Sequence, residues 1–295
     1  MTTASADDFE AHRPRLFGLA YRMLGSAHEA EDTVQDAYLR FSGADRTDIT
    51  YPAAWLAKTV THLCLSRLTS ARARRESYAG TWLPEPVVTS DGALGPLESA
   101  EQRDAVSLAM LVLLERLTPT ERAVYVLREA FAYGYREIAE VLDLSEANCR
   151  QLYRRAEQRL AAAERRFEAA PARQEELVAS FLTAARDGDL AALERLLAAD
   201  VTWWSDGGGR VTTARRPILG REKVLRFLAG VLRNFTTRPT FTTIELNGAP
   251  GLLVRDGGEL MAALGFECLG GEIAGVQAVM NPEKLDFAER QVGRV

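Results

Sequence analysis

The side chains with the most distinctive chemistry lie in the segment EANCRQLYRRAEQRL, residues 146–160. On a helix, its apolar residues form one stripe, made by Cys149, Leu152 or Tyr153, Ala156 and Leu160. The polar residues left for the outward face are Asn148, Arg150, Gln151, Arg154 and Arg155. Arginine donates to guanine edges and to phosphate, and asparagine and glutamine pair with adenine. The segment therefore favours DNA recognition, although a solvated basic helix in an all-α protein would show the same pattern.

Two further helices are expected to position this one. Thr118-Pro119-Thr120-Glu121 is typical of a helix start, with threonine as N-cap, proline at the first helical position and glutamate at the third. Residues 132–134 end that helix, and residues 135–142 form a short second helix with one apolar face. Asp143-Leu144-Ser145 then makes a tight turn whose serine caps the basic helix. Two helices joined by such a turn predict a helix-turn-helix.

The length of 295 residues predicts two to three domains. The net charge of −5 opposes general nucleic-acid binding, but the charge is unevenly spread. Residues 67–75 carry four arginines and no acid, and residues 150–166 carry six arginines against two glutamates. Because local basic patches decide phosphate contact, this pattern favours a protein that binds DNA in a restricted context.

Cysteine usage and hydropathy narrow the class further. Cys64, Cys149 and Cys268 lie far apart without a CxxC or a nearby histidine, so reduced buried thiols and no metal site are expected. No apolar run approaches the ~20 residues of a membrane span, and the polar N-terminus is no signal peptide. We therefore expect a cytoplasmic protein without membrane contact.

The first 75 residues predict another helical lobe. Residues 7–40 read as two amphipathic helices broken at Gly25-Ser26, and residues 42–50 as a loop. A long helix starts at Pro52 and ends among the arginines 67, 72, 74 and 75. The polar side of residues 31–40 is either a plain solvated face or a docking surface for another protein.

The order LFGLAYRMLGSAHEAEDTVQDAYLRF, WLAKTVTHLCLSRL and then the helix-turn-helix resembles a group 4, or extracytoplasmic-function (ECF), sigma factor. The resemblance implies that the segment DTVQD docks on the β′ clamp of RNA polymerase core, and that the helix-turn-helix lobe meets the β flap. It assigns polymerase contacts to Asp32, Gln35, Asp36, Leu39 and Arg40. It assigns the −10 element to the loop 42–50 and to Lys58, His62 and Arg67, and the −35 element to the basic helix. Ser66, Thr69 and His62 depart from the usual pattern, which weakens the −10 assignment more than the polymerase one.

Residues 76–105 form a linker rich in proline and glycine, yet they include large apolar side chains. Because such groups seek a partner surface, the stretch from Tyr78 to Pro86 is expected to dock as an extended segment. The string WLPEP, with SDGGGR and NPEKL later in the chain, resembles the ECF41 subgroup, which has a C-terminal SnoaL-like extension. The resemblance predicts a regulatory contact among Tyr78, Trp82, Leu83, Pro84, Glu85, Pro86, Asp206, Gly207, Gly208, Gly209, Asn281, Pro282, Lys284 and Leu285.

The extension itself reads as an α+β domain. Helices are expected over 174–185, 189–198 and 221–235, and strands over 201–204, 240–247, 251–255, 260–269 and 273–279. This order resembles the SnoaL/NTF2-like cone, a sheet curled round a pocket. The predicted organisation is sigma region 2 (1–75), linker (76–105), sigma region 4 (106–168) and the SnoaL-like domain (171–290).

SnoaL-like folds include cyclases and isomerases, so catalysis has to be weighed. All three histidines, His12, His28 and His62, precede the extension. The extension offers only carboxylates for acid–base work, namely Asp206, Glu245, Asp256 and Glu267. The triple glycine 207–209 lacks the GK[ST] of a phosphate loop and predicts a tight turn instead. We expect no catalytic residue, no cofactor and no metal, with a small-molecule ligand in the cone's pocket as a remaining alternative.

The sequence as a whole predicts a transcription initiation factor. It should bind RNA polymerase core and promoter DNA, and its C-terminal domain should regulate it in cis through the linker. Two alternatives remain at this point: a SnoaL-type cyclase or isomerase with an accessory DNA-binding domain, and a LuxR-like helix-turn-helix regulator.

Overall fold

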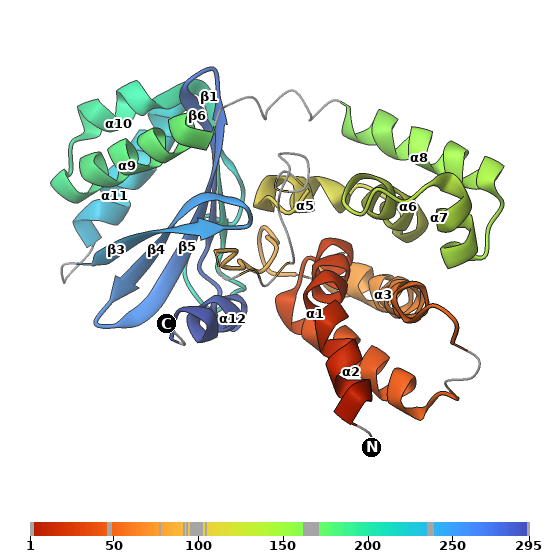
Figure 1. The fold of residues 1–295 in the computed structure, drawn as a ribbon. Coiled ribbons are helices and arrows are strands. Elements are labelled where there is room, and N and C mark those ends of the chain that lie inside the picture. The colour runs from red at the N-terminus through yellow and green to blue at the C-terminus, as the bar shows by residue number, and fades with distance from the viewer. Residues whose placement is uncertain are drawn as a thin grey trace. The chain divides into compact units, whose positions relative to one another are not determined.

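The computed structural model describes residues 3–45, 49–76, 78–90, 92, 94, 103, 105–161, 171–234 and 239–293. The chain divides into two compact units (Figure 1). The helical unit contains residues 1–77, 91–106 and 110–162. The C-terminal unit contains residues 163–295 together with 78–90 and 107–109. Residues 78–90 of the central linker thus belong to the C-terminal unit.

The helical unit begins with three helices, α1 (Thr3–Leu24), α2 (Ala27–Gly43) and α3 (Pro52–Glu76). Gly25 separates the first two with φ of 67°, a conformation that favours glycine. Ser26 then caps α2 by accepting from the Glu29 amide at 3.1 Å. The faces toward the centre are apolar, and Phe9 packs against the rings of Tyr38 and Phe41.

Four more helices are described in the following part of the chain: α5 (Leu108–Leu114), whose first two residues belong to the C-terminal unit, α6 (Pro119–Glu129), α7 (Tyr135–Leu142) and α8 (Glu146–Leu160). Thr118 and Glu121 form the predicted capping box at the start of α6. Asp143 ends α7 in the left-handed region, with φ of 55°, and Ser145 caps α8 through the Asn148 amide at 3.2 Å. The predicted helix-turn-helix is confirmed, including its turn of three residues.

The two halves of the helical unit meet around the buried guanidinium of Arg122, which is 2% exposed. Arg122 donates twice to the Arg22 carbonyl, at 3.1 and 3.0 Å, and pairs with Glu115. Glu115 also pairs with Arg75 of α3. Burial alone would raise the pKa of Glu115, but the two arginines lower it below its usual range.

We expect Glu115→Gln to destabilise the helical unit by about 2–3 kcal/mol at neutral pH, because it leaves Arg122 buried without a carboxylate. A folded-state pKa below the unfolded value means that this stabilisation is present above the unfolded pKa and is lost as the pH falls. The difference in unfolding free energy between variant and wild type should therefore become smaller below about pH 4.5. It is measured by urea unfolding followed by circular dichroism. The matched control is Glu140→Gln at an exposed i,i+4 pair with Arg136, which should stay within about 0.5 kcal/mol. A gap that does not change with pH would contradict this account.

The C-terminal unit is a six-stranded sheet with helices. Its helices are α9 (Pro171–Asp187), α10 (Leu190–Leu196), α11 (Arg221–Asn234) and α12 (Pro282–Val292). Its strands are β1 (Leu197–Asp206), β2 (Ile218–Leu219), β3 (Thr240–Leu246), β4 (Ala249–Asp256), β5 (Glu259–Leu269) and β6 (Glu272–Val279). The strand order is β2-β1-β6-β5-β4-β3, with only the β1–β6 pair parallel among the described residues.

Turn chemistry and one large apolar cluster build this sheet. Two-residue turns at Asn247-Gly248, Gly257-Gly258 and Gly270-Gly271 all have positive φ, as hairpins of this kind require. One face of the curved sheet is covered by α9 and α11 (Figure 1). Side chains from both layers fill the space between them, with Phe181 against Phe266 and Trp203 against Phe227. The α+β cone predicted by resemblance is confirmed.

The predicted elements of the extension need three corrections. The second helix ends at Leu196, not Ala198, because β1 starts at Leu197 and runs to Asp206. The short edge strand β2 carries no sequence signal of its own. Helix α12 is absent from the predicted elements, although Asn281, Pro282 and Glu283 form a good N-terminal cap sequence. Among the described helices, none is long and apolar enough to span a membrane.

Candidate regulatory and DNA-binding sites

Asp206 and the start of α12 form the centre of the candidate regulatory site. Asp206 ends β1 and is fully buried, and its carbonyl accepts from the Met280 amide at 2.7 Å. That bond places Asn281 and Lys284 beside it. Asn281 caps α12 by accepting from the Glu283 amide at 3.1 Å, so Lys284 projects from the first turn. A buried carboxylate and a buried ammonium thus face each other from two separate elements.

The linker is held by this pair. Lys284 Nζ lies 2.7 Å from Asp206 Oδ2 and also donates to the Leu83 carbonyl. The Leu83 amide donates to the same Asp206 oxygen at 2.8 Å. Tyr78 Oη donates to Asp206 Oδ1 at 2.7 Å and accepts from Asn281 Nδ2 at 2.9 Å. We call Tyr78, Leu83, Asp206, Asn281 and Lys284 the Asp206 anchor.

Two linker rings enclose the ammonium of the Asp206 anchor. Lys284 Nζ lies 4.7 Å from the Tyr78 ring centroid and 4.3 Å from that of Trp82. Such cation–π contacts gain strength where water is excluded, and Lys284 is 7% exposed. Burial and the hydrogen bond to Asp206 raise the pKa of Tyr78, so its hydroxyl stays a donor at neutral pH.

The glycine turn after β1 leaves room for the Asp206 anchor. Gly208 has φ of 60°, and a Cβ there would overlap the Asn281 side chain. Its amide donates to Asp206 Oδ1 at 3.0 Å. A Cβ on Gly207 would meet Thr213, and one on Gly209 would lie 3.1 Å from Ala79 of the linker. The predicted tight turn is present, and its glycines allow the backbone to approach Asn281 and the linker closely.

The remaining predicted contact residues surround this centre. Pro84, Pro86 and Leu285 are buried and Glu85 is half-buried, while Pro282 is the first residue of α12. A second group of contacts joins Val87, Val88 and Thr89 to Glu245, Asn247 and Gln291. Val87 and Val88 are among the large apolar linker side chains expected to seek a partner surface, but no sequence signal identified their partners.

The predicted −35 residues share the outward side of α8. Asn148, Arg150, Gln151, Arg154 and Arg155 are all exposed, while Cys149, Ala156 and Leu160 are buried. Arg150 pairs with Glu146 at 2.6 Å and lies 5.3 Å from the Tyr135 ring centroid. Tyr153 faces inward, and its hydroxyl donates to Glu129 at 2.7 Å. The helix thus presents an exposed polar face that includes three arginines.

The predicted −10 residues of α3 are partly engaged within the helical unit. Lys58 Nζ donates to the Glu140 carbonyl at 2.9 Å and pairs with Asp143 at 2.6 Å. His62 Nε2 lies 2.8 Å from the Val141 carbonyl and 3.5 Å from Asp143. The hydrogen bond from Lys58 lowers the pKa of Asp143. The end of α7 therefore covers part of the predicted −10 face.

Arg67 is the third predicted −10 residue, and it contacts α2 and not α7. It pairs with Asp36 at 2.7 Å and lies 3.9 Å from Asp32, so it sits beside the predicted polymerase contacts. Asp32, Gln35 and Arg40 are exposed, and Leu39 is 58% exposed, which is high for a large apolar side chain. The side chains of Arg72 and Arg74, and residues 46–48 of the predicted −10 loop, lie outside the described part of the structure.

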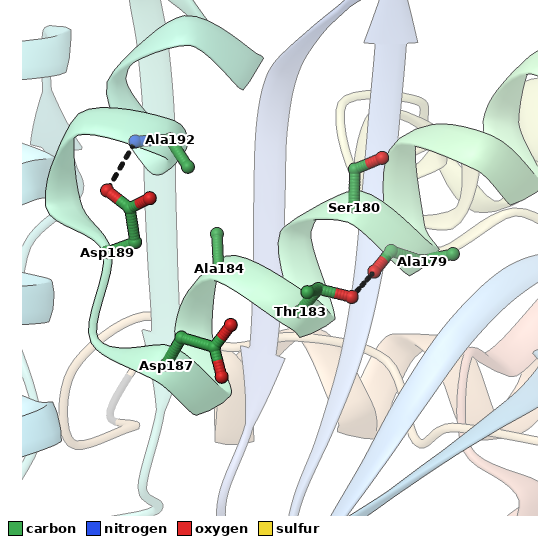
Figure 2. Close-up of a pocket in the computed structure, with 7 residues that line it drawn as sticks. All are labelled: Ala179, Ser180, Thr183, Ala184, Asp187, Asp189 and Ala192. Carbon is green, nitrogen blue, oxygen red and sulfur yellow. Dashed lines mark hydrogen bonds between the residues drawn. The ribbon is translucent and has the colours of Figure 1, made fainter.

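A hollow of about 350 Å³ lies between α9 and α10 (Figure 2). Small and acidic side chains line it, and two of them serve the helices: Thr183 donates to the Ala179 carbonyl at 3.0 Å, and Asp189 caps α10 through Ala192 at 2.9 Å. Its small and acidic lining differs from the predicted apolar pocket, and the side of the sheet under α9 and α11 is packed with apolar side chains. The described residues contain no cluster of ligands that could hold a metal.

Comparison with known proteins agrees with this arrangement. A family model for sigma-70 region 2 matches residues 9–74, and one for sigma-70 region 4 matches residues 107–160. The chain belongs to the ECF RNA polymerase sigma factors. It is 42% identical to the ECF RNA polymerase sigma factor SigJ of Mycobacterium tuberculosis over 77% of this chain and 73% of that protein. It is 30% identical to the probable ECF sigma factor SigI of the same species over 97% and 96% of the two chains.

The solved structures include a relative of the same architecture. The crystal structure of Mycobacterium tuberculosis SigJ matches with a TM-score of 0.75 and 34% identity, covering 96% of this chain and 98% of that one. The match spans the helical unit and the C-terminal unit. The sigma-factor class predicted from the motifs is confirmed, and membership of this family excludes a LuxR-like regulator.

Proposed function

We propose that this sigma factor is restrained by its own C-terminal unit, which holds the linker through the Asp206 anchor. The family binds RNA polymerase core and promoter DNA. In the proposal, α2 docks on the β′ clamp, α3 reads the −10 element, and α8 reads the −35 element beside the β flap. The observation that carries the restraint is the placement of residues 78–90 in the C-terminal unit, far along the chain from the residues that hold them.

The anchor limits how far the two promoter-reading helices can separate. The −10 and −35 elements lie about 85 Å apart at 3.4 Å per base pair of B-DNA. Fully extended, residues 77–107 between α3 and α5 could span about 100 Å. With residues 78–90 held, the free part shrinks to residues 91–107, which reach about 55 Å. A released linker can thus adjust its whole length to the promoter, whereas a held one can adjust only this part.

Contacts within the helical unit support the same conclusion. Lys58 and His62, the proposed −10 contacts, are bonded to the end of α7. DNA binding would have to displace those bonds. Each is an exposed or half-buried interaction worth about 1 kcal/mol or less, so the arrangement can open once the linker is free.

The C-terminal unit acts in this proposal as a clamp for a peptide segment and not as a catalyst. Its buried ionic pair is already used to bind the linker, and the side of its sheet under α9 and α11 is filled by apolar side chains. Turnover of a polyketide-like substrate would favour the alternative of a SnoaL-type cyclase. No observation among the described residues favours a specific small-molecule ligand.

Run-off transcription with truncated chains tests the proposal. Ending the chain before Pro171 removes the clamp, and ending it after Gln277 removes Asn281 and Lys284 while keeping most of the sheet. We expect both truncations to change transcription at least about fivefold relative to the full chain, because each removes interactions of the Asp206 anchor worth more than 1 kcal/mol. Unchanged transcription in both would refute the proposed restraint.

A further inference from the structure

The linker makes a second attachment to the C-terminal unit, at residues 87–89. This segment runs antiparallel to the end of β3, with Val88 opposite Leu246. The Thr89 amide donates to the Glu245 carbonyl at 3.1 Å, and the Asn247 amide donates to the Val87 carbonyl at 2.9 Å. Because β3 is an edge strand of the sheet, its end has free backbone groups that an extended segment can pair with. The linker therefore adds a short strand to this edge.

A glutamine of helix α12 binds the backbone of this strand on the side that faces away from β3. Gln291 of α12 accepts from the Val88 amide at 2.9 Å and donates to the Val88 carbonyl at 2.9 Å. Asn247 Oδ1 accepts from the Val87 amide at 3.1 Å. Both backbone groups of Val87 and of Val88 are thus bonded to the C-terminal unit. These contacts recognise extended backbone and not particular side chains.

Selectivity comes from the environment of the three side chains. Val87 and Val88 are 0% and 4% exposed, so apolar side chains are required there. Thr89 Oγ1 donates to Glu245 Oε1 at 2.6 Å and accepts from the Gly248 amide at 3.0 Å. A hydroxyl at the third position therefore satisfies two polar groups. The site fits an extended segment of two small apolar residues followed by threonine or serine.

We propose that the end of β3, the Asn247-Gly248 turn and Gln291 form a strand-addition site that is a second, separable anchor of the linker. The inference rests on the proposed function, since its consequence is a graded restraint. The two anchors use different residues: the Asp206 anchor holds residues 78–83, and this site holds 87–89. Loss of one anchor leaves the other at a high effective concentration, so the linker is released only in part.

Replacement of Gln291 tests the second anchor directly. In the full chain, Gln291→Ala should speed hydrogen exchange of the Val88 amide about tenfold, because it removes two hydrogen bonds from the segment. Exchange of the Leu83 amide should change less than about threefold, since the Asp206 anchor remains. Run-off transcription should rise about two- to fivefold, less than when the Asp206 anchor is broken.

A near-isosteric variant separates anchoring from simple packing. Gln291→Glu keeps the acceptor for the Val88 amide but places a carboxylate oxygen against the Val88 carbonyl. It should act in the same direction as the alanine variant. The control is Arg290→Gln, since Arg290 pairs with Asp286 at 3.1 Å on the exposed side of the same helix, and it should leave both readouts unchanged.

The outcomes keep this inference apart from the proposed function. Wild-type exchange at Val88 in both Gln291 variants would overturn the second anchor, whatever the Asp206 anchor does. Faster exchange with unchanged transcription would overturn its regulatory role. If breaking the Asp206 anchor and truncating the chain both leave transcription unchanged, the proposed function fails, even if Gln291 still protects Val88.

Discussion

Replacing Asp206 with asparagine is expected to raise run-off transcription by at least about tenfold. The Asp206 carboxylate binds Lys284 Nζ, the Leu83 amide, the Tyr78 hydroxyl and the Gly208 amide. Neutralising it leaves the buried ammonium of Lys284 without its counter-charge while the linker is held. Removing one partner of a buried pair costs about 3–5 kcal/mol, far more than the 1.4 kcal/mol that changes an equilibrium tenfold. When the linker is released, water can reach Lys284. The cost of the unpaired ammonium therefore destabilises only the state in which the linker is held.

A milder variant distinguishes loss of the Asp206 anchor from misfolding of the C-terminal unit. Tyr78→Phe keeps the ring over Lys284 and removes only the hydroxyl, which lies on the linker. It should raise transcription about fivefold, which corresponds to the ~1 kcal/mol of a typical hydrogen bond. Asp286→Asn, at an exposed carboxylate on the same helix, is the control and should have no effect. A drop in transcription with both anchor variants, despite normal circular dichroism, would mean that the contact assists initiation instead of restraining it.

Replacing Arg154 with alanine should reduce −35-dependent transcription about tenfold or more while leaving polymerase binding intact. A side chain that contacts a base edge contributes about 1–3 kcal/mol, and Arg154 lies on the exposed face of α8. The variant is best measured in the Asp206→Asn background, where the Asp206 anchor is broken and the expected transcription signal is higher. Binding to polymerase core is followed separately, because the predicted polymerase contacts lie on α2.

The control for Arg154 is Arg136→Ala on α7. Arg136 is 83% exposed and belongs to the same helix-turn-helix, but it lies outside the proposed base-reading helix. A uniform loss across promoter sequences would assign Arg154 to phosphate contact, since base contacts relax specificity at one position. Equal loss of polymerase binding and transcription would mean that the residue is structural.

The helix-turn-helix could be predicted almost to the residue because its signals are local. The Thr118 capping box, the Asp143 turn and the Ser145 cap each involve side chains within four residues of one another. The hairpins of the sheet were similarly visible from paired turn residues such as Asn247-Gly248. The Asp206 anchor was predicted only through family resemblance, since Tyr78 and Asn281 are 203 positions apart.

The second anchor illustrates what sequence reasoning cannot reach. The contacts of Val87 and Val88 use their backbone groups, and every residue has those groups. Gln291 alone carries no sign that it binds a segment 203 positions away. The cover over Lys58 and His62 was missed for a related reason, because carbonyl oxygens at the end of α7 accept their bonds. These contacts depend on the tertiary fold, and no local sequence pattern predicts them.

One measurement tests directly whether the linker must leave the C-terminal unit for transcription. Val88 and Leu246 face each other as a non-hydrogen-bonded antiparallel pair, since their neighbours make the bonds. Cβ atoms of such pairs lie about 4.5–5.5 Å apart, close to the range that a disulfide needs. A chain carrying Val88→Cys and Leu246→Cys can therefore be locked by oxidation. The native cysteines Cys64, Cys149 and Cys268 are buried, and burial raises the pKa of each thiol.

Run-off transcription is then compared for the oxidised and the reduced chain, in the Asp206→Asn background. The account predicts that the oxidised chain loses most of its transcription and regains it on reduction. Each single-cysteine variant should respond to neither treatment. Equal transcription by the oxidised and reduced double variant would contradict the claim that the C-terminal unit controls promoter recognition by holding the linker.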